Sequence, residues 1–161
     1  QFNPAIIISG KGDFGEVTQV GSAEYPYVCT TYRVTEHWQS GAMTRSVPWL
    51  GEMMPDMFVE ISESLGAALG VKSGDRVTVS TVRGTVTAPA LVTPRVKPML
   101  VHGRQTEVVG LPWHWGFMGM FTGQSANQLT PHVGDANTQI PEYKAFLVNI
   151  EKAEGRGPVR R

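Results

Sequence analysis

Apolar and polar residues alternate over short segments of this chain, which is the pattern of β-strands rather than of long helices. In residues 76–82, Val77 and Val79 point to one face, and the turn at Arg83–Gly84 leads into a second alternating segment, which predicts a β-hairpin. Pro89 in that second segment lacks an N–H donor and predicts an edge strand. Strands are expected over residues 5–9, 27–33, 57–61, 76–82, 85–92, 99–101 and 144–150.

One short segment carries helix signals. Ser62 can cap its first turn, Leu65 and Leu69 fall on one face, and Gly70 supplies a left-handed stop. The 18 glycines and 11 prolines favour tight turns elsewhere. Residues 103–143 are expected to be a long irregular connection before the last strand, and such connections in compact domains are usually functional.

The bulk properties narrow the class of protein. A chain of 161 residues fits one domain with a real core. Its 14 basic and 14 acidic residues cancel, which argues against nucleic acid or an anionic membrane as the main partner, so a bound anion must be held locally. One cysteine excludes a disulfide framework. We find no leader pattern, and the first residue, Gln1, is compatible with a processed chain or with the tail of a longer polypeptide.

The segment TYRVTEHWQSGAMTR, residues 31–45, is a polar connection that is too rich in hydrogen-bonding side chains for a plain solvated loop. Arg33, His37 and Arg45 are its candidates for binding an anion. Lys144, at the start of the last strand, either joins them in a phosphate-binding set or is a solvated edge residue. The loop therefore predicts a binding site.

A second cluster pairs histidine with aromatic residues. His37 and Trp38 are matched in kind by His114 and Trp115, but neither histidine has partners at zinc-ligand spacing or an evident nucleophile. The surrounding side chains form either an apolar core patch or a surface for a planar ligand or a partner subunit. These side chains are Trp113, Trp115, Phe117, Met118, Met120 and Phe121.

Two motifs are present only in part. GKGDFG at residues 10–15, with Glu36 further on, matches a dinucleotide fingerprint, but residues 16–26 lack the helix that this fingerprint requires, so a glycine-rich turn is the better interpretation. DANTQ at residues 135–139 has the spacing of a calcium loop, but Ile140 replaces the obligatory glycine.

For two further features the sequence does not indicate a specific functional role. Cys29 lies within a strand and is expected to be a small buried apolar residue. The amide and hydroxyl groups of GQSANQLT, residues 123–130, either bind base or pterin edges or simply cap turns, and the sequence favours neither.

Four segments in this order resemble the C-terminal domain of molybdopterin-dependent oxidoreductases of the DMSO reductase family. They are VCTTYRVTEHW, GLPWHWG, ANQLT and VGDANTQIPEYKAFLVNIEK. The resemblance spans about Tyr25 to Lys152 and is closest to respiratory-type formate dehydrogenase large subunits; periplasmic nitrate reductases share the EHW loop but usually have glycine at the position of Tyr32. It implies a mainly β fold, a six-stranded double-psi β-barrel with short helices and long loops. The domain would cover residues 1–153 with a lead-in at 1–24, and a flexible tail would follow at 154–161.

The resemblance also implies a cofactor, the molybdopterin guanine dinucleotide, present as bis-MGD with molybdenum or tungsten. Arg33 and His37 are expected near phosphate or pterin groups, Asn127 at the pterin, and Phe121 or Phe117 as a nearby aromatic. No catalytic or metal-ligating residue is expected in this chain. The expected cofactor-binding residues are Thr31, Tyr32, Arg33, Val34, Thr35, Glu36, His37, Trp38, Gln39, Ser40, Thr44, Arg45, His114, Trp115, Phe121, Asn127, Tyr143 and Lys144.

The activity that the resemblance implies is the two-electron oxidation of formate to carbon dioxide, with iron-sulfur clusters elsewhere in the enzyme. Their cysteine motifs and the metal ligand belong upstream, so the chain is a fragment or a split subunit and is inactive alone. Expected partners are the remainder of the catalytic subunit, an iron-sulfur electron-transfer subunit and a membrane cytochrome subunit, in the periplasm or alternatively the cytoplasm. The alternatives are the same domain in a nitrate reductase or formylmethanofuran dehydrogenase, and a cofactor-free interaction module.

Overall fold

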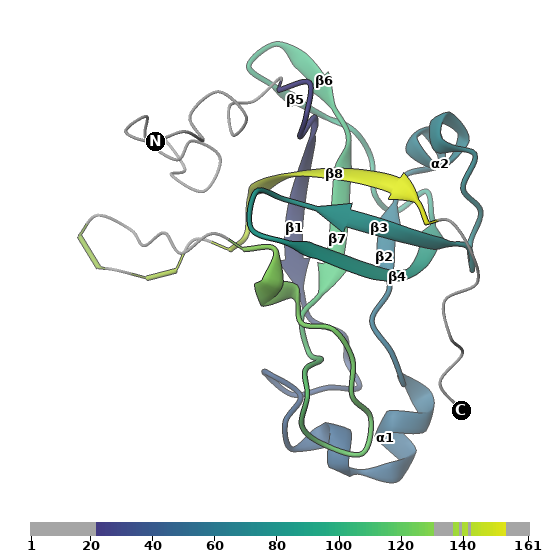
Figure 1. Ribbon diagram of the computed structural model, residues 1–161, viewed down its shortest axis with the longest axis vertical. Coiled ribbons are helices and arrows are strands. Elements are labelled where there is room, and N and C mark those ends of the chain that lie inside the picture. Colours follow the sequence, from purple (N-terminus) through teal and green to yellow (C-terminus); the bar gives the residue numbers. More distant parts are fainter. Residues whose placement is uncertain (1–21, 131–136, 139, 142, 154–161) are drawn as a thin grey trace.

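The computed structural model describes residues 22–130, 137–138, 140–141 and 143–153, and six of its strands close into a barrel (Figure 1). Around the barrel the order is β1-β7-β2-β4-β3-β8. The pairs β1–β7 and β2–β4 are parallel, and the other neighbouring pairs are antiparallel. The predicted mainly β, six-stranded barrel is confirmed. The barrel strands are β1 (Tyr27–Tyr32), β2 (Val59–Ile61), β3 (Arg76–Ser80), β4 (Thr85–Val92), β7 (Val108–Pro112) and β8 (Phe146–Lys152).

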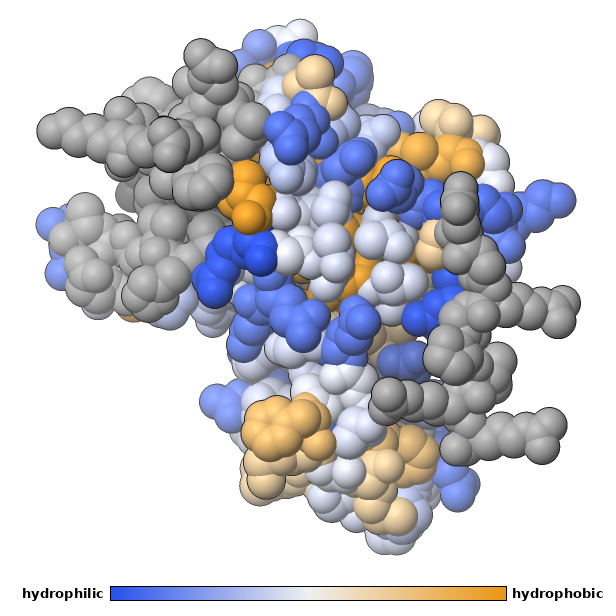
Figure 2. Space-filling model, viewed as in Figure 1, coloured by the Kyte–Doolittle hydropathy of each residue, from blue (hydrophilic) through white to orange (hydrophobic). Residues whose placement is uncertain are grey.

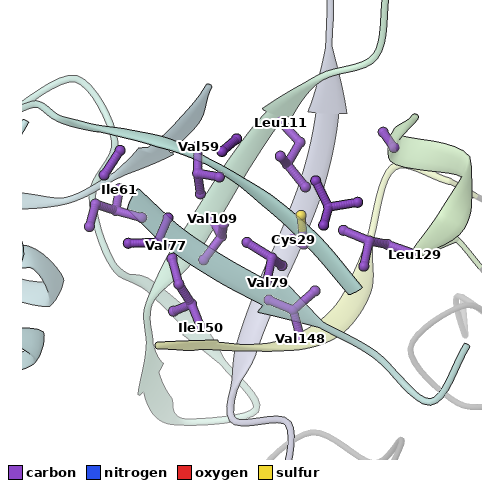
Figure 3. Close-up of a cluster of buried hydrophobic side chains, with 14 of the residues drawn as sticks. Cys29, Val59, Ile61, Val77, Val79, Val109, Leu111, Leu129, Val148 and Ile150 are labelled. Carbon is purple, nitrogen blue, oxygen red and sulfur yellow. The ribbon is translucent and has the colours of Figure 1, made fainter. Parts of the chain in front are cut away.

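Small branched side chains fill the inside of the barrel (Figure 3). The predicted hairpin is confirmed, because β3 and β4 pair antiparallel with Val79 opposite Val86 and Val77 opposite Ala88, all buried. Cys29 points into the same core and is fully buried, as predicted, and this burial raises the pKa of its thiol. The thiol is therefore a protonated core group.

One expectation about the strands is wrong, and the strand predicted at residues 99–101 is confirmed. Residues 103–143 are not all irregular, because they contain the barrel strand β7 and the short β6 (Arg104–Thr106). β7 was missed because four of its five residues are buried, so the segment shows no alternation. β5 (Met99–Val101) is a strand but pairs only with β6, in a separate two-stranded ribbon.

The edge position predicted from Pro89 is also wrong, because β4 lies between β2 and β3. The register explains how a proline fits there. Pro89 is opposite Arg76 on the β3 side, and pairing with β2 begins one residue later, at Ala90. The missing N–H of Pro89 therefore falls at the position where β4 changes from pairing with β3 to pairing with β2. The strand predicted at 5–9, the GKGDFG segment and the tail at 154–161 lie outside the described residues.

The predicted helix is α2 (Glu63–Leu69). The Ser62 hydroxyl accepts the N–H of Leu65 at 3.0 Å, and Gly70 ends the helix at φ 63°. It is not the only helix, since α1 (Pro48–Met53) begins at a proline, and single 3-10 turns occur at η1 (Thr44–Ser46) and η2 (Ala126–Gln128). None of the helices within the described ranges is long and apolar enough to cross a membrane.

α1 lies beyond one end of the barrel, beside the loop that follows β7 (Figure 1). Residues 37–56 and 113–123 together form this projection, which we call the α1 lobe. Its two segments are joined by backbone hydrogen bonds from Met120 and Phe121 to the carbonyl of Arg45. The polar loop that follows β1 leads directly into the lobe.

Candidate functional site

Parallel pairing of β1 and β7 brings the polar loop and the WHWG segment together. Thr31 is opposite Leu111 and Tyr32 opposite Pro112, so the chain leaves both strands at the same end of the barrel. His114 then joins the two connections, because its Nε2 accepts the N–H of Val34 at 2.8 Å and its Nδ1–H donates to the carbonyl of Gln39. These partners define a neutral imidazole, and burial is the main reason that its pKa is lowered.

His37 is likewise engaged at both ring nitrogens. Its Nε2 lies 2.8 Å from the carbonyl of Met54 and donates to it, so Nδ1 accepts the hydroxyl of Thr44 at 3.0 Å. The same hydroxyl oxygen accepts the N–H of Trp38. His37 and Thr44 thus fix the shape of the loop, and a phosphate contact from His37 stays a prediction.

The described residues contain no group of three or more His, Cys, Asp or Glu side chains placed to hold a metal ion.

Arg45 lies inside the α1 lobe. Its side chain is 3% exposed, and its guanidinium donates to the carbonyls of Phe121 at 3.1 Å and Gly116 at 3.4 Å. The ring of Phe121 rests against Gly51 of α1, where an added Cβ would overlap it. Both predicted residues therefore join the two segments of the lobe, and their contact with a cofactor stays a prediction.

The other predicted residues of the polar loop and the α1 lobe differ in their exposure to solvent. Trp115 is buried and its Nε1–H donates to the carbonyl of Pro55, so the interpretation as apolar core holds for this residue. Trp38, Gln39 and Ser40 are exposed, and Gln39 has a positive φ of 49°. The exposed loop segment is therefore accessible to another molecule.

A cavity of about 380 Å³ opens beside η2 and the end of β1. Three residues that line this cavity were predicted for the site: Thr31, Asn127 and Tyr143. The other lining residues were not predicted, because nothing in the local sequence indicates that the turn between β3 and β4 meets η2. There Arg83 donates to the carbonyl of Thr130 at 2.7 Å. The lining residues are Thr31, Arg83, Trp113, Asn127, Thr130, Pro141 and Tyr143.

Two cations lie beside residues that line this cavity, although neither lines the cavity itself. Lys144 Nζ donates to the carbonyl of Thr31 at 2.6 Å, and the Arg33 guanidinium lies 5.1 Å from the centre of the Trp113 ring. Burial and the nearby charge of Arg33 lower the pKa of Lys144. The ion pairs found among the described residues, Arg95 with Glu60 and Lys152 with Asp75, involve neither cation.

The indole of Trp113, a residue that lines this cavity, carries a further donor. Its Nε1–H is buried without a hydrogen-bond partner among the described residues. A buried donor of this kind is costly unless a ligand or water completes it. Together with the Asn127 amide, it complements a ligand that carries both anionic groups and hydrogen-bond acceptors, so the residues present fit a phosphate-bearing dinucleotide.

A second cavity, of about 690 Å³, lies on the other side of the end of β1. The predicted Tyr32, Arg33, Val34, Thr35 and Glu36 all line it, and sequence reasoning missed the rest. The lining residues are Thr30, Tyr32, Arg33, Val34, Thr35, Glu36, Met54, Phe58, Glu60, Leu91, Thr93, Arg95, Val96, Val108 and Gly110.

A buried carboxylate forms the floor of this second cavity. Burial pushes the pKa of Glu60 up, but hydrogen bonds from Arg95 and Tyr32 outweigh it and hold that pKa below its ordinary value of 4.5. Arg95 contacts the two carboxylate oxygens at 2.6 and 2.8 Å. The Tyr32 ring reaches Glu60 across Gly110, where an added Cβ would lie 2.8 Å from the ring. The arrangement fixes the start of the polar loop.

A closed barrel with paired cations, amide donors and two cavities around one loop defines a binding domain for a large anionic ligand. Residues 27–147 match the family model described as the molydopterin dinucleotide binding domain. The chain belongs to this family.

Similar proteins agree with this assignment. The chain is 52% identical over 139 residues to "Formate dehydrogenase subunit alpha" of Megalodesulfovibrio gigas, covering 86% of this chain and 14% of the relative. It is 57% identical over 134 residues to "Formate dehydrogenase, nitrate-inducible, major subunit" of Escherichia coli, covering 81% and 13%. Acetylene hydratase from Pelobacter acetylenicus shares the fold, with a TM-score of 0.56 at 18% identity over 80% of this chain and 18% of that one. The chain thus spans about one seventh of the length of these curated relatives.

The pKa of His114 predicts a pH dependence of stability. Because burial lowers the folded-state pKa below the ordinary value of 6.5, the unfolded chain takes up a proton before the folded chain does as the pH falls. The free energy of unfolding should therefore fall below about pH 6.5, by at most about 1.4 kcal/mol per pH unit. Urea unfolding of the chain between pH 7.5 and pH 5 measures this slope.

The control for this experiment is a matched pair of variants. His114→Asn should flatten the slope, whereas His102→Asn, at an exposed turn, should keep it. Equal slopes in both variants would contradict the assignment to His114.

Proposed function

We propose that this chain is the cofactor-binding domain of a formate dehydrogenase catalytic subunit and that it holds the molybdopterin guanine dinucleotide. The observation that carries the proposal is the pair of cations at the end of β1: Lys144 lies at the carbonyl of Thr31, and Arg33 lies over the ring of Trp113, whose Nε1–H has no partner among the described residues. The names of relatives at 52% and 57% identity support formate as the substrate.

The chain's own residues would bind and orient the cofactor. When bound, the cofactor supplies the molybdenum or tungsten at which formate is oxidised by two electrons to carbon dioxide. Arg33 and Lys144 would hold the phosphates by charge-assisted hydrogen bonds, and Asn127 would contact ring edges. A dinucleotide fixed at several points keeps the metal end in one position, which favours catalysis.

The wider assembly is also part of the proposal. The rest of the catalytic subunit would carry the metal ligand and iron-sulfur clusters, and an iron-sulfur subunit and a membrane cytochrome subunit would receive the electrons. The relatives named as alpha and major subunits support the presence of further subunits. We place the enzyme on the periplasmic side of a membrane, with the cytoplasm as the alternative.

Purification of the enzyme that contains this chain, under anaerobic conditions, tests the function. We expect molybdenum or tungsten and pterin in the preparation, together with dye reduction by formate. Reduction of nitrate without oxidation of formate would assign the same domain to a nitrate reductase. A preparation with neither metal nor pterin would reject cofactor binding in favour of an interaction module.

A further inference from the structure

The turn between β3 and β4 holds the segment that carries Asn127. We call residues 81–84 the hairpin turn, and Figure 1 shows it beside η2, the short green helix. The Thr81 hydroxyl donates to the carbonyl of Leu129 at 3.0 Å. Arg83 Nη1 donates to the next carbonyl, that of Thr130, at 2.7 Å. Two successive carbonyls just after η2 are therefore bound by one turn.

The hairpin turn is itself closely fixed. The N–H of Thr81 donates to the carbonyl of Gly84 at 2.9 Å, and the N–H of Arg83 donates to the Thr81 hydroxyl at 3.1 Å. Gly84 also lies against the carbonyl of Gln128, where an added Cβ would be 3.0 Å from the oxygen. The turn therefore fits the end of η2 by shape as well as by hydrogen bonds.

η2 depends on such outside contacts. Two backbone hydrogen bonds close it, from Gln128 to Ser125 and from Leu129 to Ala126. A single 3-10 turn of this length is not stable by itself, and the carbonyls at the end of a helix lack partners within it. The hairpin turn supplies partners at that end, so it helps to decide where η2 lies.

Asn127 is the residue of η2 that is left free to meet a ligand. Its neighbours Ala126 and Leu129 are fully buried in the core, whereas Asn127 is exposed and lines the cavity of about 380 Å³. Gln124, just before η2, accepts the N–H of Thr87 in β4 at 2.7 Å. Figure 2 shows hydrophilic surface where η2 lies, between the barrel and the α1 lobe. The backbone is thus attached to the hairpin on both sides of Asn127.

We propose that the hairpin turn is a positioning element for the cofactor, with Thr81 and Arg83 as positioning residues that act through Asn127. The inference rests on the proposed function and deepens it. A side-chain amide recognises a ring edge only within a narrow range of distance and angle, so its backbone must be held still. A donor that is already in place also costs less entropy on binding.

Thr81 separates this role from a direct contact with the cofactor. Arg83 lines the cavity and is charged, so it could also attract an anion directly. Thr81 is uncharged and is not among the residues that line the cavity. An effect of Thr81 on the cofactor must therefore pass through the hairpin turn and η2.

The Thr81→Val substitution in the catalytic subunit that contains this chain tests the proposal. Valine keeps the shape of the side chain and removes both hydrogen bonds of the hydroxyl. We expect pterin and metal to be released on the order of fivefold faster in urea below the unfolding midpoint, because the end of η2 is then held less firmly. The measurements are pterin fluorescence and metal content of the released fraction.

Thr78→Val is the matched control. The Thr78 hydroxyl lies 3.1 Å from that of Thr87, within the same hairpin but away from η2. Its loss should lower the unfolding midpoint about as much as Thr81→Val does and leave the release rate unchanged. Equal release rates in the two variants would overturn the proposal, because the effect would then be one of stability alone.

A double-mutant cycle tests whether the effect passes through Asn127. In an Asn127→Ala background, Thr81→Val should not speed release any further, since the side chain that it positions is gone. The same acceleration in both backgrounds would overturn the proposal, as would an Asn127→Ala variant that retains the cofactor like the unsubstituted enzyme.

Hydrogen exchange gives a measurement that does not depend on activity. Amides of residues 124–130 should exchange on the order of fivefold faster in Thr81→Val than in Thr78→Val, because η2 opens more often. Equal exchange would overturn the proposal. An unsubstituted enzyme without pterin would reject the proposed function and this inference with it. A loaded enzyme whose release rate is the same with and without the Thr81 hydroxyl would reject the inference alone.

Discussion

Replacement of Arg33 or Lys144 by alanine is expected to weaken retention of the cofactor by about 10- to 150-fold in each case. Each substitution removes a cation that would form a charge-assisted hydrogen bond to phosphate, which contributes about 1.5–3 kcal/mol. The effect should be large because burial and the nearby charge of Arg33 lower the pKa of Lys144, and a bound anion would relieve the repulsion between the two cations. Metal content per subunit and pterin fluorescence after oxidation measure the loss.

Lys72→Ala is the matched control, because Lys72 is an exposed lysine on the turn that follows α2. Lys144 also donates to the carbonyl of Thr31, so its loss could act by loosening β1. The unfolding midpoint of the isolated variant chain separates the two causes. Loss of cofactor with an unchanged midpoint supports direct binding, and Lys144→Arg should then restore part of it. Full occupancy in both alanine variants would remove these residues from the site.

The barrel was predictable where one face of a strand is exposed. Val77 and Val79 alternate with polar residues, and the structure places both in the core. β7 is buried on both faces between β1 and β2, so no alternation marks it. Local sequence therefore identified the half-exposed strands and missed a central one.

The sequence predicted which types of side chain the candidate site contains, but it predicted less well which hydrogen-bond partners these side chains have in the folded chain. His37 and His114 have the chemistry of ligand-binding groups, but the fold uses all four of their ring nitrogens to shape the loop. The sequence indicates only a turn at Arg83. Its contact with the carbonyl of Thr130 could not be predicted, because the two residues come together only in the folded chain. Residue type fixes what a side chain can bind, whereas tertiary contacts decide whether that capacity is already used.

The contact between Gly51 and Phe121 predicts a large effect on the stability of the α1 lobe. Gly51→Ala should lower the free energy of unfolding by about 1–3 kcal/mol, because the new methyl group must displace the Phe121 ring from α1. Backbone strain is not the cause, since Gly51 lies within a helix and its φ is not positive. Urea unfolding of the chain, followed by tryptophan fluorescence, measures the change.

A double-mutant cycle with Phe121→Ala distinguishes this steric cause from any other. Without the ring, the same Gly51→Ala substitution should be neutral or should stabilise the chain by up to about 1 kcal/mol, since alanine favours helix more than glycine does. The predicted sign of the effect therefore reverses between the two backgrounds. Equal destabilisation in both would show that Phe121 does not pack on α1, and the two segments of the α1 lobe would then lack this contact.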